Sequence, residues 1–102
     1  MRALLFVLAL AAAGCVHAAG QSHVVTIEGM KFVPERLDVA VGDTVKFVNK
    51  DVVPHTVTAA KQRVESGEIA ADRSWTFRPR AKGEVDYICR LHPVMHGSLV
   101  VH

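Results

Sequence analysis

Four side chains that can bind a transition metal occur in the C-terminal half of the sequence. Cys89, His92 and Met95 follow one another at intervals of three residues, and Pro54-His55 supplies a second imidazole upstream. Two histidines and a cysteine with a weak axial methionine form the donor set of blue-copper electron-transfer sites. The pattern therefore predicts a copper site made by His55, Cys89, His92 and Met95, with Met95 as the long axial ligand.

Each of these residues, taken alone, has a more common explanation. A single cysteine is usually a small buried hydrophobic residue, and a methionine usually fills a gap in a core. The metal interpretation depends on their coincidence, at regular spacing, in one chain. The sequence shows no serine or second cysteine beside a base, no pair of carboxylates with a reason to differ in pKa, and no glycine-rich phosphate loop. A site closed by four protein ligands leaves no position for a substrate, so we expect an electron carrier and not an enzyme.

Hydrophobic and polar residues alternate with a period of two along much of the chain, which is typical of strands. The alternation covers residues 25–28, 37–42, 45–47, 75–78, 85–89 and 99–101. Turn-forming residues separate these segments, at Gly29, Pro34, Gly42-Asp43, Asp51 to Pro54, Ser66-Gly67 and Pro79 to Gly83. Many short strands bounded by turns predict an all-β sandwich. Only residues 59–71 have a helical tendency, and the Ser66-Gly67 pair there argues against a long helix.

The strands predict where the four ligands lie. His55 follows the strand that ends near Asn49, and Cys89 closes the strand over residues 85–89. His92 and Met95 are expected on the loop before the last strand. Loops that meet at one end of a rigid sandwich can hold metal ligands in place before the ion arrives.

Residues 1–18 have the features of a secretory signal. Arg2 is followed by an apolar run that is too short to span a membrane. We expect cleavage after Ala18, or as late as Gly20, which leaves one domain over residues 19–102. A lipoprotein-like alternative retains and acylates Cys15. After ordinary cleavage Cys89 is the only cysteine, and metal ligation explains an unpaired thiol in an exported protein. Export and metal together predict a periplasmic protein.

The charge balance excludes some partners. Removal of Arg2 from the twelve basic residues leaves eleven against ten acidic ones, a net charge of about +1. Binding to nucleic acids or membrane surfaces needs basic patches, which this composition does not favour. We therefore expect neither nucleic-acid nor membrane-surface binding, and the short apolar run after Arg2 predicts no stable membrane insertion.

The ligand residues also resemble a known family. Residues 87–97 resemble the copper loop of the cupredoxins, the type 1 blue copper proteins, and the short Cys-x-x-His-x-x-Met form is similar to that of amicyanin. Further matching segments are residues 30–34, 41–45, 54–57 and 66–67, together with Asn49. Two features depart from amicyanin and plastocyanin: Thr56 replaces the asparagine after the first histidine, and the interval from His55 to Cys89 is shorter than in amicyanin.

The resemblance implies a Greek-key sandwich of seven to eight strands. Local sequence alone favours a hairpin around Gly42-Asp43, whereas the family topology does not require those two strands to be neighbours. It also implies one copper ion per chain, cycling between Cu(I) and Cu(II) in a monomer. The redox partners that it implies are a c-type cytochrome and a periplasmic dehydrogenase. A copper chaperone or storage protein is the alternative hypothesis.

Three neighbouring residues have open roles. Asn49 resembles a family position that ties the ligand loops together, or it simply ends a strand. Thr56 could act similarly through its hydroxyl or its amide. His96 is either a competing ligand or an exposed histidine, and the family pattern favours Met95 as the ligand.

An apolar surface is expected around His92. Val52, Val53, Pro54, Pro93 and Val94 are unusually hydrophobic for turn segments. They predict either a contact site for redox partners or simple packing between the two ligand loops.

Overall fold

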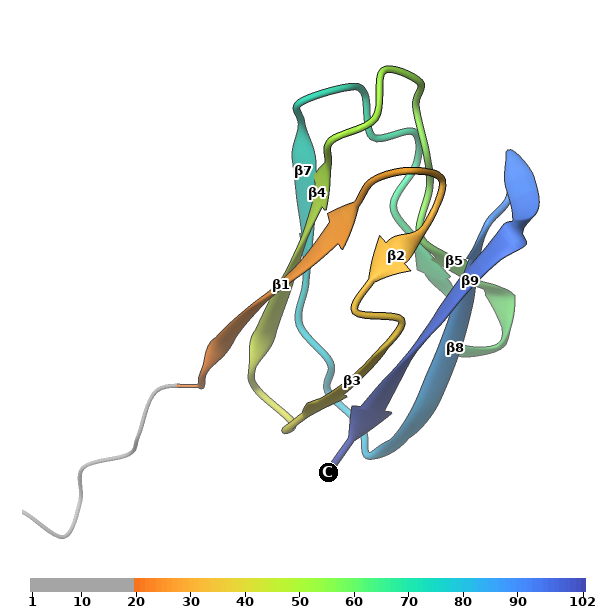
Figure 1. Cartoon of the computed structure of the whole chain (residues 1–102). Coiled ribbons are helices and arrows are strands. Elements are labelled where there is room, and N and C mark those ends of the chain that lie inside the picture. Colours follow the sequence, from red (N-terminus) through yellow and green to blue (C-terminus); the bar gives the residue numbers. More distant parts are fainter. Residues whose placement is uncertain (1–19) are drawn as a thin grey trace, which may run out of the picture.

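The computed structural model describes residues 20–102, which form two β-sheets packed face to face (Figure 1). The first sheet contains, in spatial order, β2 (Phe32–Val33), β1 (Ser22–Ile27), β4 (Thr44–Asn49) and β7 (Ser74–Phe77). The second contains β3 (Arg36–Val39), β9 (His92–Val101), β8 (Gly83–Cys89), β5 (Thr58–Ala59) and β6 (Val64–Glu65). The predicted signal segment and Cys15 lie outside the described residues.

The all-β sandwich is confirmed, with two differences in detail. Residues 20–102 contain nine strands against the seven to eight expected from the resemblance, and three of the nine, β2, β5 and β6, are only two residues long. The helical tendency of residues 59–71 produces only the 3-10 helix η1 (Ala60–Gln62). No helix within the described range is long and apolar enough to cross a bilayer.

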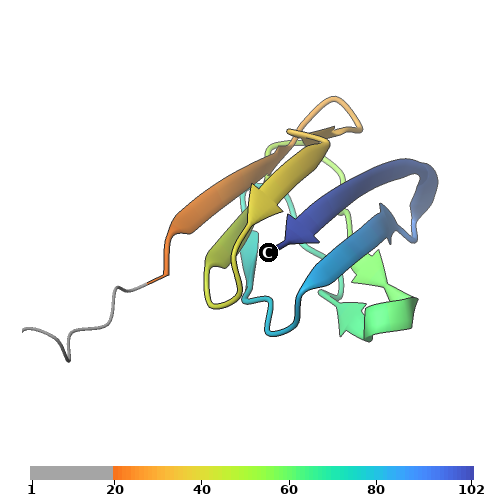
Figure 2. The same cartoon turned by 90° about the horizontal axis from the view of Figure 1, so that it is seen from below.

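The chain crosses between the two sheets, so strands that follow one another in sequence often lie in different sheets. β3 pairs with β9 and β4 pairs with β1, both in parallel, whereas the other pairs are antiparallel. The segment around Gly42-Asp43 thus connects two sheets and does not form the hairpin that local sequence favours. Seen from below, β8 and β9 lie on one side and β1 and β4 on the other (Figure 2).

Asp43 stabilises the end of the sandwich where β4 begins. Its carboxylate accepts hydrogen bonds from the amides of Ala40 and Gln21, both at 2.9 Å, and lies 2.8 Å from His23 Nε2. The Ala40 amide, and then the His23 side chain, lower the pKa of Asp43 to about 2. These bonds join the start of β1 to the turn that changes sheets.

The core lies between the sheets and follows the predicted alternation. In β8, Val85, Tyr87 and Cys89 are buried while the residues between them are exposed. Phe32 and Phe47 pack edge-on against the Tyr87 ring, with centroids 4.9 and 5.4 Å away. Edge-to-face aromatic pairs add to the hydrophobic burial of such residues. This cluster makes a firm support for the end of β8.

The junction between β8 and β9 is irregular. Ile88 is opposite His96, yet Cys89 is opposite His92, so residues 93–95 have no partner in β8. Such a bulge bends a strand and redirects its side chains. His92 and Met95 therefore lie within β9, and their predicted position on a loop before the last strand is wrong. Beyond this irregularity the two strands pair once more, through Cys89 and His92.

Candidate metal centre

Three predicted ligands meet at the end of the sandwich. Cys89 Sγ lies 3.7 Å from His55 Nδ1 and 3.8 Å from His92 Nδ1. The donor atoms of these three residues all lie within 4.8 Å of one another. His55 and Cys89 are fully buried, and the two imidazole rings are 5.2 Å apart at an interplanar angle of 64°. Residues far apart in sequence thus form one cluster of soft and nitrogen donors.

The spacing of these atoms fits a single first-row transition metal. Ligand bonds of about 2.0 Å to imidazole nitrogen and about 2.3 Å to thiolate sulfur are usual for such ions. At angles of roughly 120°, these lengths place nitrogen and sulfur about 3.7 Å apart. The observed separations match this value, and the His₂Cys set is the one that suits copper.

Asn49 holds the loop that carries His55. Its side-chain amide donates to the carbonyls of Val53 and Ile69, both at 2.9 Å, and its Oδ1 accepts from the amide of Asp51 at 2.8 Å. His55 and Ile69 exchange two backbone hydrogen bonds in an isolated bridge. The side chain of Asn49 is fully buried, so these bonds are shielded from water. Asn49 therefore ties the loop that carries His55 to the segment at Ile69; none of these bonds reaches the segment that carries Cys89, His92 and Met95.

Asp51 orients the ring of His55 and is not among the predicted site residues. Its Oδ2 lies 2.8 Å from His55 Nε2, which leaves Nδ1 directed at Cys89. The same carboxylate accepts from the amides of Gly29 and Met30 at 2.8 and 3.0 Å. Burial opposes ionisation of Asp51, but the two amides and the imidazole outweigh it and lower its pKa.

The sequence offered only a weak signal for Asp51. It precedes His55 by four residues, but in an irregular loop that spacing says nothing about distance. Carboxylates that bind the second nitrogen of a ligand histidine fix its tautomer and ring orientation. The turn at Gly29 and Met30, where both residues have positive φ angles of 65° and 61°, brings the two amides to the carboxylate.

Thr56 binds the cysteine ligand directly. Its amide donates to Cys89 Sγ at 3.3 Å, and its hydroxyl accepts from the amide of Arg90 at 2.9 Å. The threonine that replaces the family asparagine thus contacts residues on both sides of the β8 end. Both of the suggested routes, amide and hydroxyl, are used.

The remaining predicted residues separate into buried and exposed groups. His92 is half-buried, while Met95, three residues further along β9, is 2% exposed. His96 points away from the core, with its Nδ1 3.3 Å from Glu35 Oε2 and a side chain that is 64% exposed. The structure therefore places Met95 on the buried side of the bulge and His96 on the solvent side.

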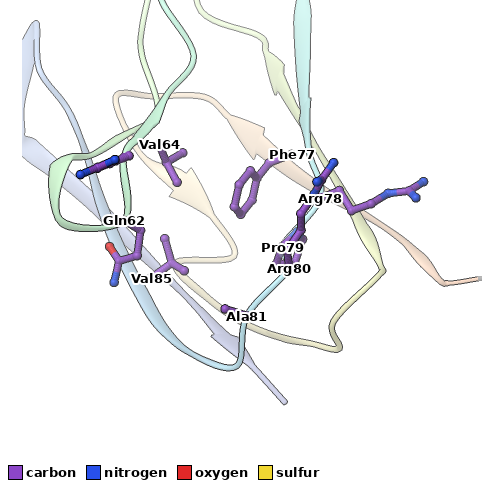
Figure 3. Close-up of a pocket in the computed structure, with 9 residues that line it drawn as sticks. Gln62, Val64, Phe77, Arg78, Pro79, Arg80, Ala81 and Val85 are labelled. Atoms are coloured by element: carbon purple, nitrogen blue, oxygen red, sulfur yellow. The ribbon is translucent and has the colours of Figure 1, made fainter.

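A cavity of about 300 Å³ lies elsewhere, between the edges of the two sheets (Figure 3). Its lining residues are Gln62, Arg63, Val64, Phe77, Arg78, Pro79, Arg80, Ala81 and Val85. Phe77 points across it toward Val64 and Val85, whereas the guanidinium group of Arg78 points away (Figure 3). None of the four predicted ligands lines it, so it adds no group to the metal centre.

The fold and the donor set define a small β-sandwich metalloprotein with the ligands of a type 1 copper site. A family model described as a cupredoxin-like domain matches residues 1–101, and the chain belongs to the cupredoxin family. Amicyanin-alpha from Methylorubrum extorquens is 32% identical, with 99% of each chain covered. Amicyanin from Paracoccus versutus is 35% identical over 76% of this chain and 63% of its own length.

Solved structures give the same picture. A variant of amicyanin in its Cu(I) form has a TM-score of 0.75 and 29% identity, and covers 88% of this chain and 89% of its own. A copper-containing nitrite reductase from Thermus scotoductus has a TM-score of 0.74 and 26% identity, and covers 79% of this chain but 22% of the reductase. The similarity to amicyanin therefore extends over nearly whole chains, whereas the reductase shares one part of its length.

Proposed function

We propose that this protein is a blue copper protein that binds one copper ion per chain and carries single electrons between redox proteins. The observation that supports this most is the preformed donor set: Cys89, His55 and His92 stand at the separations that a trigonal copper site requires. Met95, which is buried in β9, is the expected fourth ligand.

Copper supplies the one-electron couple, and the protein supplies a fixed and shielded set of donors. Asn49, Asp51 and Thr56 hold His55 and Cys89 through hydrogen bonds that the protein makes by itself. Donors that are already in place have little to rearrange when the charge of the site changes. Burial of His55 and Cys89 keeps water away from these two donors.

The proposed location is the periplasm, and the proposed partners are a c-type cytochrome and a periplasmic dehydrogenase. The signal-like residues 1–18 support export. Val52 and Val94, on the segments that carry His55 and His92, are 92% and 85% exposed, which supports a contact surface for other proteins. Encounters that pass an electron need only a small interface, which a monomer can offer.

Buried ligands favour electron transfer over copper delivery. A chaperone must hand its metal to another protein, so it is expected to expose its ligands. Here His55, Cys89 and Met95 are at most 2% exposed. The part shared with the nitrite reductase is about a fifth of that enzyme, which gives no reason to assign an activity to this chain.

The optical and EPR spectra of the protein with one equivalent of Cu(II) test the proposal. Thiolate-to-copper charge transfer should give an intense blue colour, and Cys89→Ser should abolish the colour while the circular dichroism of the fold is retained. Cys89 is the free thiol of the described residues, which makes this substitution specific. A colourless Cu(II) form of the unmodified protein would falsify the proposal.

A further inference from the structure

A closed ring of hydrogen bonds begins at the residue after the cysteine ligand. The amide of Arg90 donates to Thr56 Oγ1 at 2.9 Å, and that hydroxyl lies 2.8 Å from Thr58 Oγ1. Thr58 Oγ1 donates to Glu65 Oε1 at 3.0 Å. Glu65 Oε1 also accepts from Arg90 Nε at 3.1 Å, so the ring returns to the residue where it began.

The direction of every bond in the ring follows from counting protons. The Arg90 side chain, followed by the amide of Gly67, lowers the pKa of Glu65, so this carboxylate is ionised at neutral pH and can only accept. Thr58 must therefore donate its single hydroxyl proton to Glu65. The proton between the two threonines then has to come from Thr56. All the donors point from Arg90 toward Glu65, and hydrogen bonds aligned in this way strengthen one another.

The ring is joined to the cysteine ligand through Thr56. The Thr56 amide donates to Cys89 Sγ at 3.3 Å while the Thr56 hydroxyl holds the amide of Arg90. Thr56 and Cys89 are both fully buried, so the bond to sulfur does not compete with water, and the bond to the Arg90 amide is partly shielded. Thr56 thus binds both the Cys89 sulfur and the amide of the following residue, Arg90. These two bonds together fix the distance between the Thr56 amide and Sγ.

The other side of the ring is anchored in the second sheet. Thr58 in β5 is opposite Glu65 in β6 and Ile88 in β8. The second oxygen of Glu65 accepts from the Gly67 amide at 2.7 Å. Glu65 and Arg90 have side chains 44% and 45% exposed, and an exposed ion pair by itself contributes little stability. Their position is better explained by their hydrogen bonds to the two threonines: Glu65 accepts from the Thr58 hydroxyl, and the Arg90 amide donates to the Thr56 hydroxyl.

We infer that Thr58 and Glu65 are positioning residues for the cysteine ligand, acting through Thr56 to hold an amide donor on Cys89 Sγ. This inference rests on the proposed copper function. A donor to the thiolate stabilises negative charge at the sulfur, and the reduced site carries one more electron than the oxidised site. The ring therefore raises the reduction potential, although Thr58 and Glu65 contact none of the ligands.

Three substitutions test the ring without removing the amide that binds sulfur. Thr56→Val and Thr58→Val replace a hydroxyl with a methyl group of similar size, and Glu65→Met removes the acceptor at similar length. Thr76→Val, at an exposed position in β7 of the other sheet, is the matched control. Each ring variant should lower the reduction potential of the copper form, and the control should leave it unchanged.

Amide hydrogen exchange in the metal-free protein provides a readout that needs no copper. The Arg90 amide should exchange about fivefold faster in each ring variant, the factor expected for one hydrogen bond of ordinary strength. The double variant Thr56→Val/Glu65→Met should shift potential and exchange no further than Thr56→Val alone, because either change opens the same ring.

The inference is rejected if the Thr58→Val and Glu65→Met variants fold normally but keep the reduction potential and the Arg90 amide exchange rate of the unmodified protein. It is equally rejected if the double variant shows the sum of the single effects. If Thr56→Val fails to fold, the two more exposed variants still decide the question. Failure of copper binding would appear instead as loss of the blue colour in the unmodified protein, which leaves the exchange experiment valid.

Discussion

An imidazole can bind a metal through either ring nitrogen, and a carboxylate makes the choice at His55. Asp51 accepts from Nε2 at 2.8 Å, so the unprotonated Nδ1 faces Cys89. Loss of such a partner usually weakens metal binding 10- to 100-fold. We expect Asp51→Asn to weaken Cu(II) binding by about tenfold and Asp51→Ala by up to about a hundredfold, because the amide retains one acceptor oxygen.

Titration against a competing chelator measures this effect. Asp38 offers the matched control, since it also pairs with a histidine, His102 Nε2 at 3.0 Å, but on the exposed surface. Asp38→Ala should bind copper like the unmodified protein. Equal affinities for the Asp38→Ala and Asp51→Ala variants would show that Asp51 does not orient His55.

Met95 and His96 are adjacent, but only Met95 is buried. Met95→Gln should keep the blue colour and lower the reduction potential, because an oxygen donor favours Cu(II) over the softer Cu(I). Each tenfold change in relative affinity shifts a one-electron potential by about 59 mV, and we expect at least one such step. Voltammetry of this variant and of His96→Ala compares the two residues. A larger shift for His96→Ala would reverse the axial assignment.

At the scale of elements, strands β8 and β9 contact each other closely where Gly97 faces Tyr87. A Cβ atom on Gly97 would lie 2.5 Å from Tyr87 Oη and 2.6 Å from Cζ. Overpacking of this kind costs about 1–3 kcal/mol, so Gly97→Ala should lower the free energy of unfolding by about that amount. Because the tyrosine ring also supports the end of β8, the blue absorption band should shift as well.

Tyr87 itself carries a buried hydroxyl that has no hydrogen-bond partner within the described residues. Burial also raises its pKa, so the group stays protonated. An unpartnered buried polar group costs about 1–3 kcal/mol, so Tyr87→Phe should leave the free energy of unfolding unchanged or increase it. Urea denaturation measures the free energy of unfolding of both the Gly97→Ala and the Tyr87→Phe variants. A loss of more than about 1 kcal/mol in Tyr87→Phe would mean that the hydroxyl has a partner.

How well the sequence predicted these elements depended on whether the signal was local. The alternation in residues 85–89 correctly predicted that Val85, Tyr87 and Cys89 share the buried face, because successive strand residues point to opposite sides. Such patterns do not reveal which distant strands pair with one another. The separation of β3 and β4 into two sheets could be predicted only from the resemblance to cupredoxins.

The metal centre shows the same limit. Its four ligands were predicted from residue type and spacing, and the structure brings His55, Cys89 and His92 together. The bulge that places His92 and Met95 within β9 depends on how the β8–β9 register slips, which no spacing reveals. Asp51, Thr58 and Glu65 were missed for a related reason: their contacts join loops and strands that only the folded chain brings near one another.

At the scale of the whole molecule, the segments that bring His55 and His92 to the metal centre also carry exposed apolar side chains. Val52, Val53 and Val94 are 92%, 39% and 85% exposed, and they belong to the two segments that carry His55 and His92. Residues that only packed the loops together would be buried, so their exposure favours a contact site over simple packing. An apolar surface of this kind commonly marks a site of protein contact. The half-buried His92 ring would give the shortest route between the site and a docked partner.

Charged substitutions on this surface test whether electrons pass through it. Val94→Lys and Val53→Lys should each slow electron transfer with a c-type cytochrome by about tenfold, within the range seen among variants of one interface. Val24→Lys is the matched control, because Val24 is 55% exposed on the outer face of the first sheet and acquires the same charge. Stopped-flow rates at matched ionic strength separate docking from net charge, and unchanged reduction potentials exclude an effect on the metal centre. If all three lysine variants react at the same rate as the unmodified protein, electrons enter and leave by another surface.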